Sequence, residues 1–180
     1  MRFLGVLFCL SILFVSCVEQ EPTLNDIQVI GSHNSYKIPI EKPLWNYLYS
    51  IDSLKALSLH YGHSPLEKQL ELGLRNLELD VFYDPKGGLF KNPKGLDIIK
   101  TMGEDPIEFD AENKLNNPGL KLFHIQDIDY RSHYLIFKDA LQALKKWSDT
   151  NPNHSPIFIL INAKDLMVIP KFENKTSKTL

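Results

Sequence analysis

Short apolar runs alternate with segments of helical periodicity along most of this chain. The strand-like runs are residues 26–30, 74–82, 120–126 and 156–161. Apolar residues at helical spacing occur in residues 37–59, 64–72 and 134–148. Strands that alternate with helices predict right-handed parallel βα units, here four of them. The last run, Pro156 to Ile161, is continuously apolar, which is typical of a strand buried on both faces of a parallel sheet.

Two further segments refine this pattern. Residues 64–72 have a marked helix start, because Ser64 is a suitable cap, Pro65 suits the first helical position and Glu67 completes a capping box. Residues 90–119 are rich in Asn, Pro, Gly and charge and show little periodicity. They predict an excursion from the fold that carries one short helix.

The N-terminus has the pattern of an export signal. Arg2 supplies positive charge, and the apolar run from Phe3 to Val15 is too short to span a bilayer comfortably as a helix. The run ends at Ser16-Cys17 and resembles a bacterial lipobox, in which Cys17 is lipidated and becomes the new N-terminus. The alternative is cleavage nearby by ordinary signal peptidase, which leaves Cys17 a free thiol.

These patterns predict the organisation and the location of the chain. Residues 1–16 are expected to be a signal peptide and residues 17–25 a lipidated tether. The expected location is the bacterial cell envelope, as an exported lipoprotein anchored in the membrane. The alternative is a periplasmic or secreted protein.

The charge balance narrows the set of partners. The 20 basic and 22 acidic residues include no basic block, so the chain has no footprint for nucleic acid. The same balance gives no reason for electrostatic adhesion to an anionic membrane. Contact with lipid would come from the anchor or from exposed aromatic side chains.

The candidate chemistry lies where strand-like runs end. Glu78 and Asp80 alternate with apolar residues, so both carboxylates point to one side of a sheet, where a cation is needed to pair them. A hard cation with oxygen ligands suits such a cluster. His33 and His124 can exchange protons with an oxygen substrate, and together these groups predict an enzyme that acts on a phosphodiester. The segments that carry them are Ile30–Tyr36, Leu77–Val81 and Leu122–Asp127.

An ordered set of motifs between about Asp26 and Asp165 resembles a known family. It is similar to the calcium-dependent phosphoinositide phospholipase C family of bacteria and fungi, which is related to the catalytic domain of eukaryotic phospholipase C. Any one motif alone is weak, and the ordered set is specific. The motifs are His33–Tyr36, Ser64–Leu70, Gly73–Asp80, Asp84–Gly88, His124–Tyr130 and Trp147-Ser148.

The resemblance implies a (β/α) barrel of the TIM type with a calcium site. Asn34, Glu78 and Asp80 would bind Ca²⁺, and Asn162 closes the fourth strand beside them. In the eukaryotic relatives an acidic residue stands at the position of Asn162, so we expect lower calcium affinity here.

The resemblance also implies the roles of the remaining site residues. His33 would stabilise the phosphoryl transition state and act in acid chemistry, and His124 would lie on the other side of the phosphate. Independently of the resemblance, alternation along a strand points Lys164 the same way as Asn162, which makes it a candidate contact of the phosphate. The substrate would be a phosphoinositide or another phospholipid, cleaved to diacylglycerol and a cyclic inositol phosphate.

The length sets an expectation about the barrel. Eight βα units usually need about 250 residues, and this chain supplies four units in 180. Residues 26–165 are therefore expected to form the N-terminal half of the catalytic barrel, with residues 166–180 as a polar tail. Such a chain would be truncated and weakly active, or two copies would pair and close the sheet as a dimer.

Two other functions stay open. A glycerophosphodiester phosphodiesterase shares the barrel and a Glu-x-Asp pair followed by a histidine, although that family typically begins with His-Arg where this chain has His33-Asn34. An inactive envelope lipoprotein derived from the same fold is the other alternative.

Overall fold

The structure is a computed structural model that describes residues 23–164. The predicted signal peptide, Cys17 and the polar tail of residues 166–180 lie outside the described residues. Within residues 23–164, none of the helices combines the length and apolar character needed to cross a bilayer. The strands are β1 (Gly31–Ser32), β2 (Asn76–Asp84), β3 (Gly119–Leu122) and β4 (Phe158–Lys164). The helices are α1 (Lys42–Ile51), α2 (Ser53–Leu59), α3 (Leu66–Glu71), α4 (Lys94–Thr101) and α5 (Phe137–Thr150), with 3₁₀ turns η1 (Leu24–Asp26) and η2 (Lys114–Asn116).

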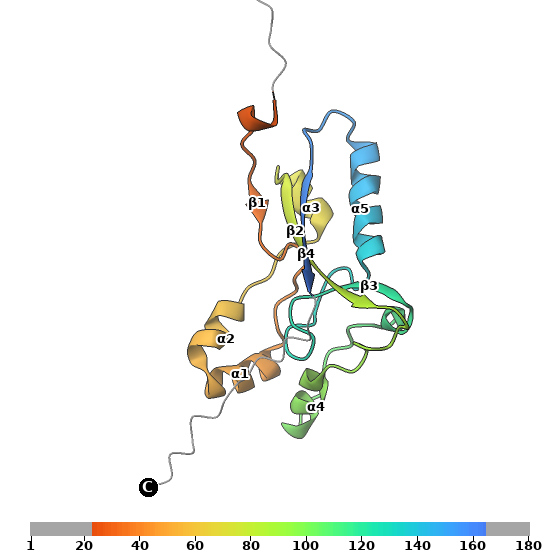
Figure 1. Cartoon of the computed structure of the whole chain (residues 1–180). Coiled ribbons are helices and arrows are strands. Elements are labelled where there is room, and N and C mark those ends of the chain that lie inside the picture. The colour runs from red at the N-terminus through yellow and green to blue at the C-terminus, as the bar shows by residue number, and fades with distance from the viewer. Residues whose placement is uncertain (1–22, 165–180) are drawn as a thin grey trace, which may run out of the picture.

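Strand β2 is the centre of a four-stranded mixed sheet (Figure 1). β4 pairs with it in parallel from Asn76 to Phe82, and β1 pairs in parallel at its start. β3 pairs antiparallel with the other end of β2, from Val81 to Asp84. Since β4 covers one edge of β2, β1 and β3 follow one another along the opposite edge. The described part of the chain is thus an α/β protein.

The prediction of four parallel units is wrong for the third strand. The excursion after Asp84 returns at the same end of β2 from which it left, since Asp84 is in register with Gly119. The returning strand therefore runs in the opposite direction, and α4 within the excursion does not act as a crossover helix. β3 also ends at Leu122, so His124 lies in the turn after the strand and not on it.

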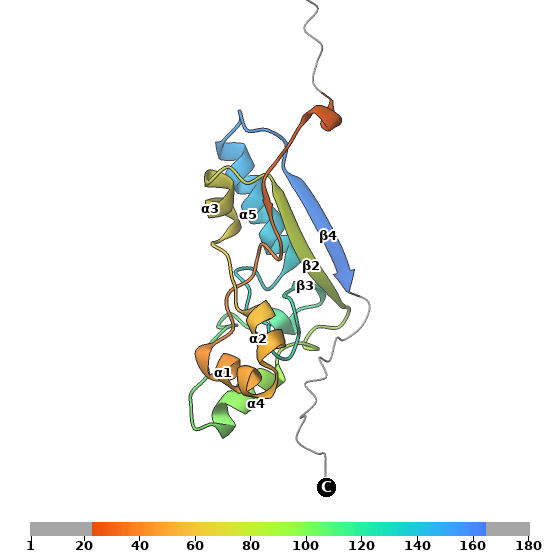
Figure 2. The ribbon, with the colours of Figure 1, turned by 90° about the vertical axis from the view of Figure 1, so that its left-hand side faces the viewer.

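One face of the sheet carries the main core. Figure 2 shows α3 and α5 side by side on one face of β2. Leu77, Leu79 and Val81 point toward these helices and are at most 4% exposed. Because side chains alternate along a strand, Glu78 and Asp80 point to the opposite face, as the sequence predicted. The helix residues in this core are Leu66, Leu70, Ala140, Leu144 and Trp147.

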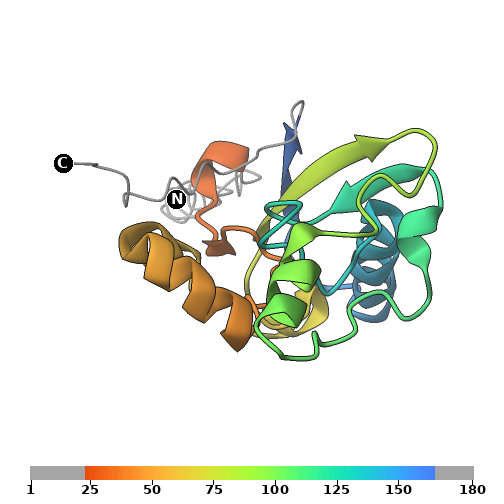
Figure 3. The ribbon, with the colours of Figure 1, turned by 90° about the horizontal axis from the view of Figure 1, so that it is seen from below.

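A second core lies at the carboxyl end of the parallel strands. The views in Figures 1 and 3 place α1, α2 and α4 together at the end of the sheet toward which β2 and β4 run. Leu44 and Leu48 of α1 pack there against Ala56 and Leu59 of α2 and Ile99 of α4. This layer closes the strand ends, which is where α/β proteins commonly bind ligands.

The predictions for β4 and for the start of α3 need correction. Leu160 and Ile161 are 57% and 52% exposed, so the described part of the molecule does not bury β4 on both faces. The reason is that β4 pairs within residues 23–164 with β2 alone, while α3 and α5 lie over β2. The N-cap of α3 is Pro65 rather than Ser64, and no side chain caps the helix.

Candidate active site

The loop after β1 is held tightly against β2. The backbone N–H of Ser35 donates to the carbonyl of Glu78 at 3.0 Å, and the N–H of Glu78 donates to Ser35 Oγ at 2.9 Å. The buried amide of Gln69 in α3 donates to the carbonyls of Ser35 and Ser64. Asn34 has a φ of 51°, a left-handed conformation that is uncommon for a residue other than glycine. These bonds explain how the first motif is brought to the carboxylates of β2.

Two of the predicted site residues meet at Tyr61, in the loop after α2. The Tyr61 hydroxyl accepts a hydrogen bond from Asn34 Nδ2 at 2.7 Å and lies 3.3 Å from His33 Nδ1. On its other side, His33 Nε2 lies 3.5 Å from Glu78 Oε2. The imidazole of His33 is thus held between a phenol and a carboxylate, with its side chain 68% exposed.

Asn34 and Asp80 meet at a second tyrosine. The buried hydroxyl of Tyr36 donates to Asn34 Oδ1 at 3.2 Å. Burial raises the pKa of Tyr36 far above its usual value, and the neighbouring carboxylate of Asp80 raises it further. Tyr36 therefore connects Asn34 in the loop after β1 with Asp80 in β2.

Strand β4 adds two groups to this cluster. The amide of Asn162 donates from Nδ2 to Asp80 Oδ1 at 2.8 Å. The ammonium of Lys164 lies 3.2 Å from the other oxygen, Oδ2. Asp80 is 1% exposed, and its Oδ2 receives no hydrogen bond despite the nearby ammonium.

The second histidine belongs to a buried charge network. His124 Nδ1 lies 2.8 Å from Asp129 Oδ2, and Lys37 Nζ lies 3.1 Å from Asp129 Oδ1. A carboxylate only accepts hydrogen bonds, so the neutral imidazole of His124 carries its proton on Nδ1 and has its lone pair on Nε2. Burial lowers the pKa of Lys37 and the carboxylate of Asp129 opposes that effect. Lys37 Nζ also lies 4.5 Å from the ring centroid of Tyr61, which links this network to His33.

Tyr61 lies among the three carboxylates of the site. Its pKa is raised above the usual value, mainly by burial. The charges of Asp129, Asp80 and Glu78 raise it further, while the hydrogen bond from Asn34 opposes the shift. Within residues 23–164, the structure thus connects the predicted catalytic and calcium-binding residues and Lys164, since His124 joins the others through Asp129, Lys37 and Tyr61.

Sequence reasoning assigned no role to Lys37, Tyr61 or Asp129. Asp129 lies in the quoted motif His124–Tyr130, and its distance of five residues from His124 in an irregular turn gives no periodic signal. Lys37 directly follows the first motif, and its complete burial cannot be read from a sequence in which lysine is normally exposed. Tyr61 lies in a loop without a pattern, so only its contacts identify it.

The donors of the site fit a hard divalent cation in kind. Asn34, Glu78 and Asp80 offer amide and carboxylate oxygens, which are the ligands that Ca²⁺ prefers. Oδ2 of Asp80 makes no hydrogen bond, although the ammonium of Lys164 lies beside it. Within residues 23–164 no three His, Cys, Asp or Glu side chains cluster as a metal site, so a cation here would depend on the amide oxygens as well.

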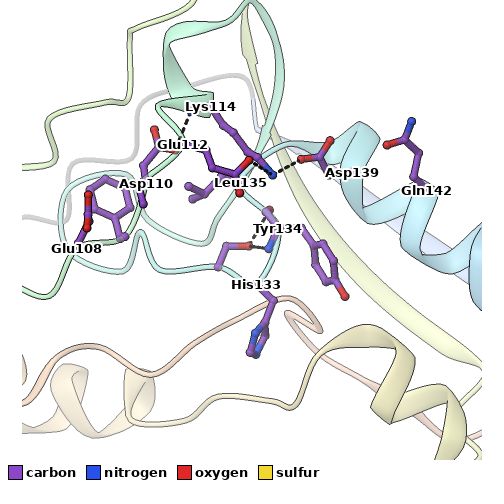
Figure 4. Close-up of a pocket in the computed structure, with 12 residues that line it drawn as sticks. Glu108, Asp110, Glu112, Lys114, His133, Tyr134, Leu135, Asp139 and Gln142 are labelled. Atoms are coloured by element: carbon purple, nitrogen blue, oxygen red, sulfur yellow. Dashed lines mark hydrogen bonds and ion pairs between the residues drawn. The ribbon is translucent and has the colours of Figure 1, made fainter.

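The pocket in Figure 4 is a separate feature. It has a volume of about 630 Å³ and contains none of the predicted site residues. Lys114 lies 3.0 Å from Asp139 and 3.4 Å from Glu112 in its wall. The carboxylates that line this pocket outnumber its cations, which makes the pocket unsuited to a phosphate ester. The four acidic residues are Glu108, Asp110, Glu112 and Asp139.

His33 follows β1, His124 follows the antiparallel strand β3, and the carboxylates of Glu78 and Asp80 lie within β2 rather than at its end as predicted. Two histidines and a carboxylate pair on an α/β scaffold define the class of protein as a candidate phosphodiesterase. A family model described as phosphoinositide phospholipase C, Ca²⁺-dependent, matches residues 23–178. The chain therefore belongs to this family, which confirms the resemblance seen in the sequence. Searches of curated proteins and of solved structures gave no match.

Proposed function

We propose that this protein is a calcium-dependent phosphodiesterase of the phospholipase C type, with an inositol phospholipid as substrate. The observation that carries the proposal is the continuous network from His33 through Tyr61, Lys37 and Asp129 to His124. At one end of this network, His33 Nε2 lies 3.5 Å from Glu78 Oε2, within β2. Family membership supports the same reaction class.

In the proposed reaction the inositol 2-hydroxyl attacks phosphorus. A new O–P bond forms, the P–O bond to diacylglycerol breaks, and the product is a cyclic inositol phosphate. His124 accepts the hydroxyl proton on Nε2, because Nδ1 is engaged by Asp129. His33 gives a proton to the leaving oxygen. Calcium, when held by Asn34, Glu78 and Asp80, would lower the pKa of the hydroxyl and neutralise developing charge.

The membrane is the proposed place of action. Export, lipidation of Cys17 and anchoring in the cell envelope bring the site to phospholipid, and they rest on the sequence pattern of residues 1–17. Mass spectrometry of the exported protein tests this part. A mature N-terminus other than a lipidated Cys17 would contradict it.

An assay with two substrates and a vesicle-binding measurement tests the reaction. The full chain is incubated with phosphatidylinositol in mixed micelles, with calcium or with a chelator, and cyclic inositol phosphate is measured. Release of glycerol phosphate from glycerophosphoinositol would instead favour the glycerophosphodiester phosphodiesterase. Binding of phospholipid vesicles without turnover of either substrate would favour the inactive lipoprotein.

Histidine variants make the test specific. His33→Ala and His124→Ala should each lower the rate by about 100-fold or more, the usual effect of losing a general acid or base. His154→Ala is the matched control, since His154 contacts Ser148 at the end of α5, remote from the carboxylates. Equal losses in all three variants would point to a general effect on folding.

A further inference from the structure

The buried carboxylate of Asp80 already faces a cation that belongs to the chain. Lys164 Nζ lies 3.2 Å from Asp80 Oδ2, and the Lys164 side chain is 23% exposed. Asp80 Oδ1 is engaged by the amide of Asn162 at 2.8 Å. Both oxygens of this carboxylate therefore face donors from β4, and a metal ion that used Asp80 would have to compete with them.

The strand register accounts for this arrangement. Asn162 is directly opposite Asp80 in the parallel pair of β2 and β4, and Lys164 is opposite Phe82. Since side chains alternate, Asn162 and Lys164 share the face of Asp80 and Glu78. The residue opposite Glu78 is Leu160, which offers no polar contact. The cation supplied by β4 is thus directed to Asp80.

The net charge of the site determines how well it can hold a divalent cation. Glu78 and Asp80 carry two negative charges, which one divalent cation would balance. With the ammonium of Lys164 in place, the same ion would leave an excess positive charge in a largely buried site, where screening is weak. The amide at Asn162 adds no negative charge to offset that excess.

We propose that Lys164 is an internal counter-ion of Asp80 that competes with divalent cations for this carboxylate. Calcium then binds weakly, and only when it displaces the ammonium. The inference rests on the proposed function for the choice of calcium, and it concerns affinity rather than turnover. It also assigns Lys164 a role different from contact with the phosphate.

Calcium binding by the full chain tests the proposal without substrate. Isothermal titration with calcium chloride should give a Kd weaker than about 0.1 mM for the unaltered protein, in the range of weak protein sites. Lys164→Met keeps most of the aliphatic stem and removes the charge, so its Kd should be at least about 10-fold lower, equivalent to about 1.4 kcal/mol. Lys164→Gln serves as a second neutral variant and should behave alike.

Two controls separate charge from other effects. Lys164→Arg retains the positive charge and should show no gain in affinity. Adding Asp80→Asn to Lys164→Met should remove the gain, because the ion then lacks its main ligand. Circular dichroism establishes that each variant compared is folded.

Four results would overturn the proposal: micromolar calcium affinity in the unaltered protein, no gain in a folded neutral variant, an equal gain in Lys164→Arg, or a gain that survives Asp80→Asn. Failure of the proposed function is distinguishable from these. If the neutral variants gain calcium affinity but the protein cleaves no lipid, the counter-ion role of Lys164 stands and the proposed function fails. If the protein cleaves lipid but the neutral variants gain no affinity, only the counter-ion role fails.

Discussion

The carboxylate of Asp129 accepts a hydrogen bond from Nδ1 of His124 at 2.8 Å. The same carboxylate lies 3.1 Å from Nζ of Lys37, and the side chains of Asp129 and Lys37 are fully buried. One acidic residue therefore sets the tautomer of a proposed catalytic histidine and neutralises a buried lysine. Both functions can be tested separately.

The tautomer of His124 should reverse in Asp129→Asn. The ammonium of Lys37 lies beside Oδ1, so it will hold the amide oxygen and turn the amide nitrogen toward His124. Nδ1 then has to accept, and the imidazole proton moves to Nε2. Nitrogen-15 NMR of the imidazole should report the reversal, and the rate of lipid cleavage should fall by about 10-fold or more because Nε2 no longer accepts a proton.

His154 is the internal reference for this measurement, because it lies outside the network. Its nitrogen shifts should be unchanged in Asp129→Asn. An unchanged tautomer of His124 in the folded variant would show that Asp129 does not set its protonation.

Removal of Lys37 should strongly destabilise the fold. Lys37→Met leaves the buried carboxylate of Asp129 without its cation and deprives the carbonyls of Leu59 and Tyr61 of their donor. Breaking a buried pair in this way typically costs about 3–5 kcal/mol in the free energy of unfolding. Urea unfolding followed by circular dichroism measures it.

The matched control is an exposed ion pair. Lys145 and Asp149 lie one turn apart on α5, 75% and 60% exposed. Lys145→Ala should change the free energy of unfolding by less than about 0.5 kcal/mol, the usual value for such a pair. Similar losses from Lys37→Met and Lys145→Ala would contradict the structural role of the buried pair.

Two leucines on α5 should differ sharply when shortened. Leu144 is 5% exposed and packs against β2, whereas Leu141 is 38% exposed. Leu144→Ala should lower the free energy of unfolding by about 2–5 kcal/mol, because it removes buried contacts and leaves a cavity. Leu141→Ala should cost much less, and equal effects would show that α5 packs in another orientation.

Stability should fall with pH in the alkaline range. Burial raises the pKa of Tyr36, Tyr130 and Tyr134 above the ordinary value of 10.0. Above that pH the unfolded state loses these protons while the folded state keeps them, so folding is progressively disfavoured as pH rises. Each tyrosine contributes a slope of up to about 1.4 kcal/mol per pH unit.

Urea unfolding between about pH 10.5 and 12 measures this slope. Most lysines of the unfolded chain are neutral over this range, so they contribute less to the slope than the tyrosines. Tyr134→Phe provides the check, since the Tyr134 hydroxyl is bonded to Glu67 and its ionisation is removed by the change. Its slope should be smaller by about 1.4 kcal/mol per pH unit. An unaltered slope would mean that Tyr134 ionises equally in both states.

The sequence alone determined the family and pointed to most residues of the candidate site. The period-two pattern around Glu78 and Asp80 fixed the face to which they point, because alternation is a property of the extended backbone itself. The motif of His33 and Asn34 was evident from a different local signal, a polar cluster at the end of an apolar run. Such local signals do not depend on the rest of the fold.

Only the tertiary structure decided how distant segments meet. The antiparallel direction of β3 follows from where the excursion of residues 85–118 returns to β2, and no local pattern encodes that point. The exposure of β4 likewise depends on which elements cover it. The ion pairs of Lys37 with Asp129 and of Lys164 with Asp80 join residues 92 and 84 positions apart, so their burial and charge balance arise only when the sheet and its loops are assembled.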